Sequence, residues 1–179
     1  MIYKNKVIFT LGPKGTDAEF QARQLANEVV LTASFSEAMS TAFENNCLAL
    51  VACGFIKNEG DKVIESWIDL HYSYFGKMRT KKAWASPTKP MQLIKRLGHD
   101  REVKRIALHP ATKVFAQNHL GGAELIFVDN KPAAMELLNM DKVDAAIVST
   151  DMILCPEKFT VIDEFMPEMV WVLYEKDKI

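Results

Sequence analysis

The segment with the clearest chemical character is residues 11–19, LGPKGTDAE, where a predicted strand ends in a glycine turn and a helix begins. The backbone N–H groups at a helix N-terminus, together with the positive end of the helix dipole, suit a carboxylate or a phosphate. We therefore expect an anionic small-molecule substrate to bind here. The residues expected to bind it are Gly12, Gly15, Thr16 and Asp17.

The same segment also fits a purely structural role. Thr16 or Asp17 can act as the N-cap of the helix, and Glu19 stands three positions after Thr16, as in a capping box. The sequence leaves the anion site and the capped helix open as alternatives. The spacing of a Walker A nucleotide loop is absent.

Two further candidates follow predicted strands, at the edge of the sheet where α/β proteins bind ligands. His109 follows the strand at 105–108, and the alternative for it is a hydrogen bond to nearby backbone. Cys53 ends the strand at 48–53, and the alternative for it is a buried structural thiol. Trp171 and the other two tryptophans are expected to pack in the core.

Composition and charge argue against several function classes. The chain has 179 residues, of which 49% are hydrophobic and 25% charged, as in ordinary globular proteins. A net charge of −1 gives no case for nucleic-acid binding, and no apolar run approaches the roughly 20 residues of a membrane span. Three irregularly spaced cysteines fit neither a disulfide framework nor a zinc site. We expect a cytoplasmic protein with no metal or other cofactor; a homodimer is left open.

Short apolar strands alternate with helices along the chain, which predicts an α/β fold with mostly parallel sheets. The expected strands are 7–11, 29–32, 48–53, 105–108, 125–128, 145–149 and 169–174, with a further β-favouring stretch at 72–86. Pro87 and Pro90 interrupt this rhythm and indicate a lobe boundary. We expect lobe 1 at 1–84, with 165–179 returning to it, lobe 2 at 85–164, and a ligand cleft between them.

Four segments, taken in order, resemble the prephenate dehydratases. Residues 12–19 resemble the GPxGTxSE opening of that family, and residues 106–117, IALHPATKVFAQ, are similar to its SHPQAxxQ segment. Residues 131–134 and 144–149 resemble its STAxAA and AAIAS pair. Order and spacing hold over nearly the whole chain. The resemblance implies a fold like that of type II periplasmic binding proteins, with prephenate bound between two lobes.

The resemblance also implies further binding residues. Lys57 and Lys131 fall in segments that line the cleft in the relatives, where a lysine can pair with a substrate carboxylate. Asn130 stands where the family has a polar Ser-Thr pair. Solvated lysines are the alternative for both cations.

Departures from the family pattern bear on the reaction. The family's PIENS reads CGFIK at residues 53–57, and its Thr-Arg-Phe, whose threonine is taken as catalytic, reads EMV at residues 168–170. The C-terminal segment PEMVWVLY looks more like the PMSWSLF of bacilysin-type prephenate decarboxylases. We expect a protein without the phenylalanine-sensing ACT domain of many dehydratases.

The resemblance therefore implies a lyase of a biosynthetic pathway, such as antibiotic or amino-acid biosynthesis, that acts on prephenate or a related cyclohexadienyl carboxylate. Decarboxylation without aromatisation needs a proton at a ring carbon, and dehydration needs one at the leaving hydroxyl. Glu168 and His109 are the candidate catalytic residues, Glu168 provided that it is buried away from water. An exposed glutamate after Pro167 is the alternative. Dehydration to phenylpyruvate and a non-catalytic anion-binding module remain alternative functions.

Overall fold

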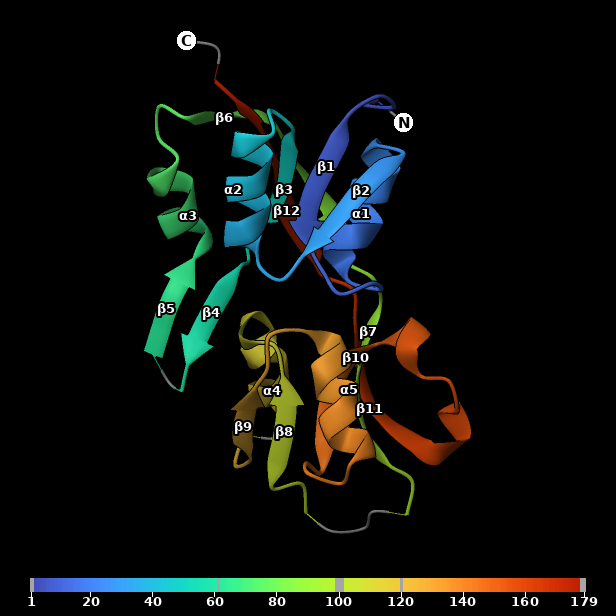
Figure 1. Cartoon of the computed structure of the whole chain (residues 1–179). Coiled ribbons are helices and arrows are strands. Elements are labelled where there is room, and N and C mark those ends of the chain that lie inside the picture. The colour runs from blue at the N-terminus through green and yellow to red at the C-terminus, as the bar shows by residue number, and fades with distance from the viewer. Residues whose placement is uncertain (1, 61, 99–101, 120, 178–179) are drawn as a thin grey trace. The chain divides into compact units, whose positions relative to one another are not determined.

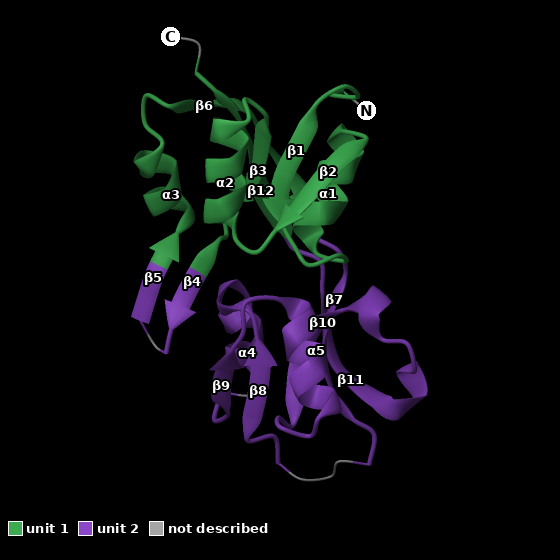
Figure 2. Ribbon diagram, viewed as in Figure 1, with its two compact units in different colours: residues 1–56, 65–87, 168–179 green, residues 57–64, 88–167 purple. Residues whose placement is uncertain are grey.

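The computed structural model describes residues 2–60, 62–98, 102–119 and 121–177, and the chain divides into two compact units (Figures 1 and 2). Unit 1 consists of Met1–Ile56, Glu65–Pro87 and Glu168–Ile179. Unit 2 consists of Lys57–Ile64 and Thr88–Pro167.

Unit 1 is built on a five-stranded sheet. Its strands are β1 (Val7–Leu11), β2 (Glu28–Thr32), β3 (Leu48–Ala52), β6 (Met78–Pro87) and β12 (Glu168–Lys176). Their order across the sheet is β2-β1-β3-β12-β6. The first three strands are parallel, and β12 runs antiparallel between β3 and β6, so four of the five strands share one direction. All five residues of β3 are buried, as expected for a strand covered on both faces.

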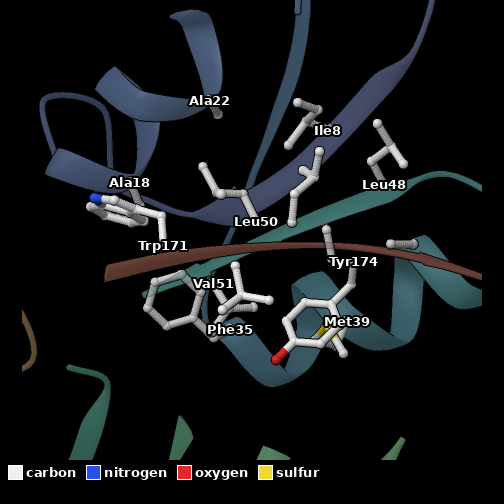
Figure 3. Packing of buried hydrophobic residues seen from close by; sticks show 14 of the residues in the cluster. Ile8, Ala18, Ala22, Phe35, Met39, Leu48, Leu50, Val51, Trp171 and Tyr174 are labelled. Carbon is white, nitrogen blue, oxygen red and sulfur yellow. The ribbon is translucent and has the colours of Figure 1, made fainter. Parts of the chain in front are cut away.

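Two helices cover this sheet from opposite sides. They are α1 (Asp17–Leu25) and α2 (Phe35–Glu44). Figure 3 shows Ala18 and Ala22 of α1 on one side of the strands and Phe35 and Met39 of α2 on the other. These side chains belong to one buried apolar cluster, which also includes Trp171 and Tyr174 of β12.

A short helix is fixed to unit 1 by a buried phenol. The helix α3 (Trp67–Ser73) follows a two-stranded sheet of β4 (Ile56–Glu59) and β5 (Lys62–Ser66). The hydroxyl of Tyr174 accepts a hydrogen bond from the indole N–H of Trp67 at 3.0 Å and lies 2.9 Å from Nδ1 of His71. Tyr174 is buried, and the Trp67 and His71 rings stack with centroids 5.2 Å apart. One strand therefore contacts two successive turns of this helix through Trp67 and His71.

Unit 2 has a second five-stranded sheet. Its strands are β7 (Met91–Arg96), β8 (Arg105–Leu108), β9 (Glu124–Phe127), β10 (Ala145–Ser149) and β11 (Phe159–Phe165), in the order β11-β7-β10-β8-β9. Here β7 is the strand that opposes the other four. The mostly parallel α/β fold class predicted from the sequence is confirmed.

The helices of unit 2 also cover opposite faces of their sheet. They are α4 (Lys113–His119) and α5 (Lys131–Asn139), with single 3₁₀ turns at η1 (Pro110–Thr112), η2 (Thr150–Met152) and η3 (Pro156–Lys158). Ala116 of α4 clusters with Ile106 of β8, and Ala134 of α5 clusters with Ala107. Since successive strand residues point to opposite faces, the two helices lie on different sides. None of the described helices is long and apolar enough to cross a membrane.

Candidate functional site

In unit 1, the predicted binding residues gather at the edge of the sheet where β1 and β3 end. These strands are parallel, with Ile8 opposite Leu48, so the loops that follow them emerge side by side. The glycine turn at 12–16 follows β1, and Cys53 follows β3. The helices after β1 and β2 cover opposite faces (Figure 3), which makes this edge a topological switch point, the usual ligand site of open α/β sheets.

The glycine turn is a tightly capped helix start. Thr16 is the N-cap of α1, and its hydroxyl oxygen accepts the N–H of Glu19 at 3.2 Å. The same hydroxyl donates to the carbonyl of Leu11 at 3.1 Å. Gly15 has φ +95°, a conformation that favours glycine, and its N–H donates to the Glu19 carboxylate at 2.6 Å. The structural alternative drawn from the sequence is therefore present, and Gly15 already has an acceptor within the chain.

The carboxylate of Glu19 lies in the interior rather than in water. The residue is only 5% exposed, and its second oxygen accepts from Nε of Arg23 at 2.8 Å. Burial raises the pKa of the Glu19 carboxyl, but the hydrogen bonds from Gly15 and Arg23 and the charges of Arg23 and Lys14 outweigh burial, so its pKa lies below the usual value of 4.5. Glu19 is thus ionised at neutral pH and holds the turn together.

This arrangement predicts a pH-dependent effect of Glu19→Gln. Because the pKa of Glu19 is lower in the folded chain, its stabilisation is present above the unfolded value of about 4.5 and is lost as the pH falls through the folded value. We expect Glu19→Gln to lower the free energy of unfolding by about 1–3 kcal/mol at pH 7, and the difference from wild type to shrink below about pH 4.5. Urea unfolding of both proteins at several pH values measures it.

Glu37→Gln is the matched control for this prediction. Glu37 accepts the N–H of Ala33 at 2.8 Å in the same position relative to α2, but it is exposed. The control substitution should therefore lower the free energy of unfolding at pH 7 clearly less than Glu19→Gln does. A loss for Glu19→Gln that stayed constant across the acid range would contradict the proposed role of its charge.

Gly54 and Met169, which both depart from the dehydratase pattern, contact each other at this edge. A Cβ atom at Gly54 would lie 2.6 Å from Cε and 2.9 Å from Sδ of Met169. A glycine is therefore needed at position 54 for the thioether to pack so closely, and Met169 packs in turn against the core cluster. Glu168 precedes it as the first residue of β12, opposite Pro87 of β6, and is exposed. The structure does not give Glu168 the dry surroundings on which its role as an acid depends.

Cys53 is tied to the same strand. Its backbone N–H donates to the carbonyl of Val170 at 2.8 Å, and the residue is half-buried against the core cluster. Burial raises the pKa of the Cys53 thiol, which keeps it neutral at physiological pH. At this position the neutral thiol acts as a small apolar packing group rather than as a nucleophile.

In unit 2, the remaining candidates lie mainly at the edge where β8 and β9 end. These strands are parallel, with Leu108 opposite Phe127. His109 directly follows β8; its Nδ1 accepts the N–H of Ala111 at 3.2 Å. In the neutral ring the proton is then assigned to Nε2.

The polar residues after β9 have structural partners as well. Asn130 is the N-cap of α5, and its side-chain oxygen accepts the N–H of Ala133 at 2.9 Å. Lys131 begins α5 and is half-buried, whereas Lys57 lies in β4 and is exposed. The structure thus places six candidates at the edge in unit 1 and three at the edge in unit 2. Lys57 lies at neither edge but in β4. Among the described residues, no three His, Cys, Asp or Glu side chains gather where they could hold a metal ion.

One residue at the edge in unit 1 has a chemical property that the sequence did not reveal. Trp171 is 2% exposed, and its indole N–H has no hydrogen-bond partner in the described part of the chain. The sequence indicated a packing role only, because an unpaired donor can be recognised only from the surrounding atoms. The continuous apolar run of β12 indicates a buried strand, but not what lies opposite the indole nitrogen.

The same arrangement of strands and helices occurs in solved structures. A prephenate dehydratase from Arthrobacter aurescens, crystallised with L-Phe, matches 97% of this chain and 60% of its own length, with a TM-score of 0.64 and 17% identity. The prephenate dehydratase of Staphylococcus aureus subsp. aureus Mu50 matches 94% of this chain and 66% of its own, with a TM-score of 0.59 and 15% identity. The chain has a prephenate dehydratase-like fold.

The fold is also shared with a protein of a different kind. The periplasmic VFT2 domain of Bordetella pertussis BvgS matches 96% of this chain and 80% of its own length, with a TM-score of 0.56 and 13% identity. The fold is thus periplasmic-binding-protein-like, and the chain spans 60% and 66% of the length of the two dehydratases. No protein-family model and no curated sequence matches the chain.

Proposed function

We propose that this chain binds prephenate, or a closely related cyclohexadienyl carboxylate, and removes the ring carboxylate without aromatising the ring. The fold shared with prephenate dehydratases supports the class of ligand. The ordered motifs at residues 12–19, 106–117, 131–134 and 144–149 support it further. The first follows the carboxyl end of β1, the second spans the end of β8, the third follows β9, and the fourth contains β10.

The observation that carries the choice of reaction is the packing of Met169 over Gly54. In the dehydratase pattern, an arginine preceded by the catalytic threonine occupies this place. Here a thioether fills the space and the neighbouring Glu168 points to water, so no hydroxyl of the dehydratase kind stands there. An apolar wall favours loss of CO₂, since the transition state disperses the negative charge of the carboxylate into the ring.

The proposed step needs one proton and no cofactor. The bond between the ring and the carboxylate carbon breaks, CO₂ leaves, and the electron pair enters the ring and is quenched by a proton at a ring carbon. The hydroxyl stays in place. His109, whose Nε2 carries the proton of the neutral ring, is the first candidate donor. Glu168 is the second candidate and depends on being shielded from water in the liganded protein.

A non-catalytic binding module is the second candidate function. The observation that favours it is the internal pairing of the polar groups. Glu19 accepts the hydrogen bond of the Gly15 N–H, and Asn130 caps α5. A fold that kept its helix caps and lost its reactive groups would bind an anion and do nothing to it.

Incubation with prephenate separates the two functions. Ligand at about 100 times its Kd raises the free energy of unfolding by about 2.7 kcal/mol, which a thermal melt resolves. A raised melting temperature together with consumption of prephenate supports the enzyme. A raised melting temperature with prephenate intact supports the binding module, and no shift at all refutes prephenate as the ligand.

A further inference from the structure

The buried indole of Trp171 offers an N–H that nothing in the described chain accepts. Tryptophan has no other polar atom, so this N–H is a donor only. Leaving such a donor buried and unpaired costs about 1–3 kcal/mol, and nearly all buried polar groups in folded proteins avoid that cost. An acceptor from outside the chain would remove it.

The register of β12 places this indole on the face covered by α1. Trp171 lies opposite Trp84, and Met169 lies opposite Ser86. Residues two apart on a strand, and residues directly opposite in an antiparallel pair, share a face. Gln21 of α1 donates to the hydroxyl of Ser86 at 3.0 Å, which ties that face to the helix.

Figure 3 shows where the ring lies along α1. The indole is next to Ala18, in the first turn of the helix, with its nitrogen at the end away from Leu50. Leu50 lies opposite Leu173, deeper along the strand pair than Ala52, which faces Trp171. The nitrogen therefore lies toward the edge where β3 ends, the edge that also carries the glycine turn.

Two donors of the glycine turn already have acceptors within the chain. The N–H of Gly15 donates to Glu19, and the hydroxyl of Thr16 donates to Leu11. The helix dipole of the nine-residue α1 still favours negative charge at this end, and the indole N–H of Trp171 has no acceptor among the described residues. An anionic ligand at this edge gains most from an oxygen placed at the indole.

We propose that the indole N–H of Trp171 is a ligand-binding group that donates a hydrogen bond to a carboxylate oxygen of the substrate. The inference rests on the proposed function for the identity of the ligand, a cyclohexadienyl carboxylate. Met169, on the same face two residues away, supplies the apolar wall next to that oxygen.

Indole NMR of the full ¹⁵N-labelled chain tests the proposal. The chain has three tryptophans, so three indole signals are expected, and single Trp→Phe variants assign them. On titration with prephenate, the Trp171 signal should move downfield. The Trp67 signal should stay in place, because that indole already donates to Tyr174. Phenylpyruvate and inorganic phosphate are titrated in parallel as further anions.

Binding by Trp171→Phe gives the second measurement. This variant keeps an aromatic ring and removes the N–H, so its affinity for prephenate should fall about tenfold or more, as for a lost hydrogen bond to a charged group. Trp84→Phe, opposite it on the same face, is the matched control and should bind as the wild type does.

The outcomes separate this inference from the proposed function. Wild-type binding of prephenate with an unmoved Trp171 signal, or with full affinity in Trp171→Phe, overturns the inference and leaves the proposed function standing. A Trp171 signal that shifts with phosphate or phenylpyruvate but not with prephenate supports Trp171 as a ligand-binding donor and refutes prephenate as the substrate. A Trp171 signal that shifts with none of the three anions overturns the inference.

Discussion

Replacing His109 with asparagine is expected to slow the turnover of prephenate by about 10²-fold or more, the usual loss for a general acid. Asparagine is a good N-cap, and its side-chain oxygen can accept the N–H of Ala111 as Nδ1 of His109 now does. The substitution therefore keeps the cap at the end of β8 and removes the imidazole ring with its Nε2 proton. Steady-state kinetics and a thermal melt of the same protein measure both effects.

Glu168→Gln is the companion experiment, because Glu168 is the other candidate donor. Its side chain is exposed at the start of β12, so the substitution should leave stability within about 0.5 kcal/mol of the wild type. We expect a smaller loss of turnover than for His109→Asn. Full activity in His109→Asn with a 10²-fold loss in Glu168→Gln would move the acid to Glu168. Full activity in both would exclude both residues.

Tyr174→Phe is expected to destabilise the chain by about 1–3 kcal/mol, although it removes a single oxygen. The hydroxyl accepts the N–H of Trp67 and faces Nδ1 of His71, so the variant leaves two polar groups without their partner. These contacts hold α3 against β12. Urea unfolding followed by circular dichroism measures the loss, and Tyr72→Phe, an exposed tyrosine of the same helix, is the control.

The same phenol predicts a change in alkaline stability. Burial raises the pKa of Tyr174 to about 12, and the nearby Cys53 adds to this, although the hydrogen bond from Trp67 acts in the other direction. Because the folded chain holds the proton more tightly, this stabilisation is complete below the unfolded pKa of about 10 and is lost as the pH rises through about 12. Tyr174→Phe should lack this contribution to the alkaline loss. If the free energies of unfolding of the variant and the wild type fell in parallel as the pH rises, this assignment would be contradicted.

The elements that could be predicted from the sequence are those with strong local signals. The strands at 7–11, 105–108 and 145–149 have the predicted bounds, because each is a short apolar run closed by turn residues. The helix α3 was not predicted, and its last two residues fall in the stretch at 72–86 that was expected to favour strands. Tryptophan, tyrosine and histidine are weak helix formers, but Asp69 accepts the N–H of Ser66 at 2.9 Å and caps the turn. Its second support, the hydroxyl of Tyr174, lies about a hundred residues away in the sequence.

The candidate site was predictable to the same degree. The sequence placed the glycine turn, His109 and Asn130 at the ends of strands, where the structure has them. It could not show that Gly15 gives its N–H to Glu19 at 2.6 Å, since a capping box more often engages the N-cap residue itself. Nor could it show the close approach of Met169 to Gly54, which depends on the pairing of β12 with β3.

The central claim is decarboxylation of prephenate with retention of the ring hydroxyl, and the product tests it most directly. The purified chain is incubated with prephenate at neutral pH, and the product is examined by mass spectrometry and proton NMR. The account predicts loss of CO₂ alone, with olefinic ring protons, a carbinol proton and no phenylpyruvate. Loss of both CO₂ and water, with the aromatic signals of phenylpyruvate, would contradict it.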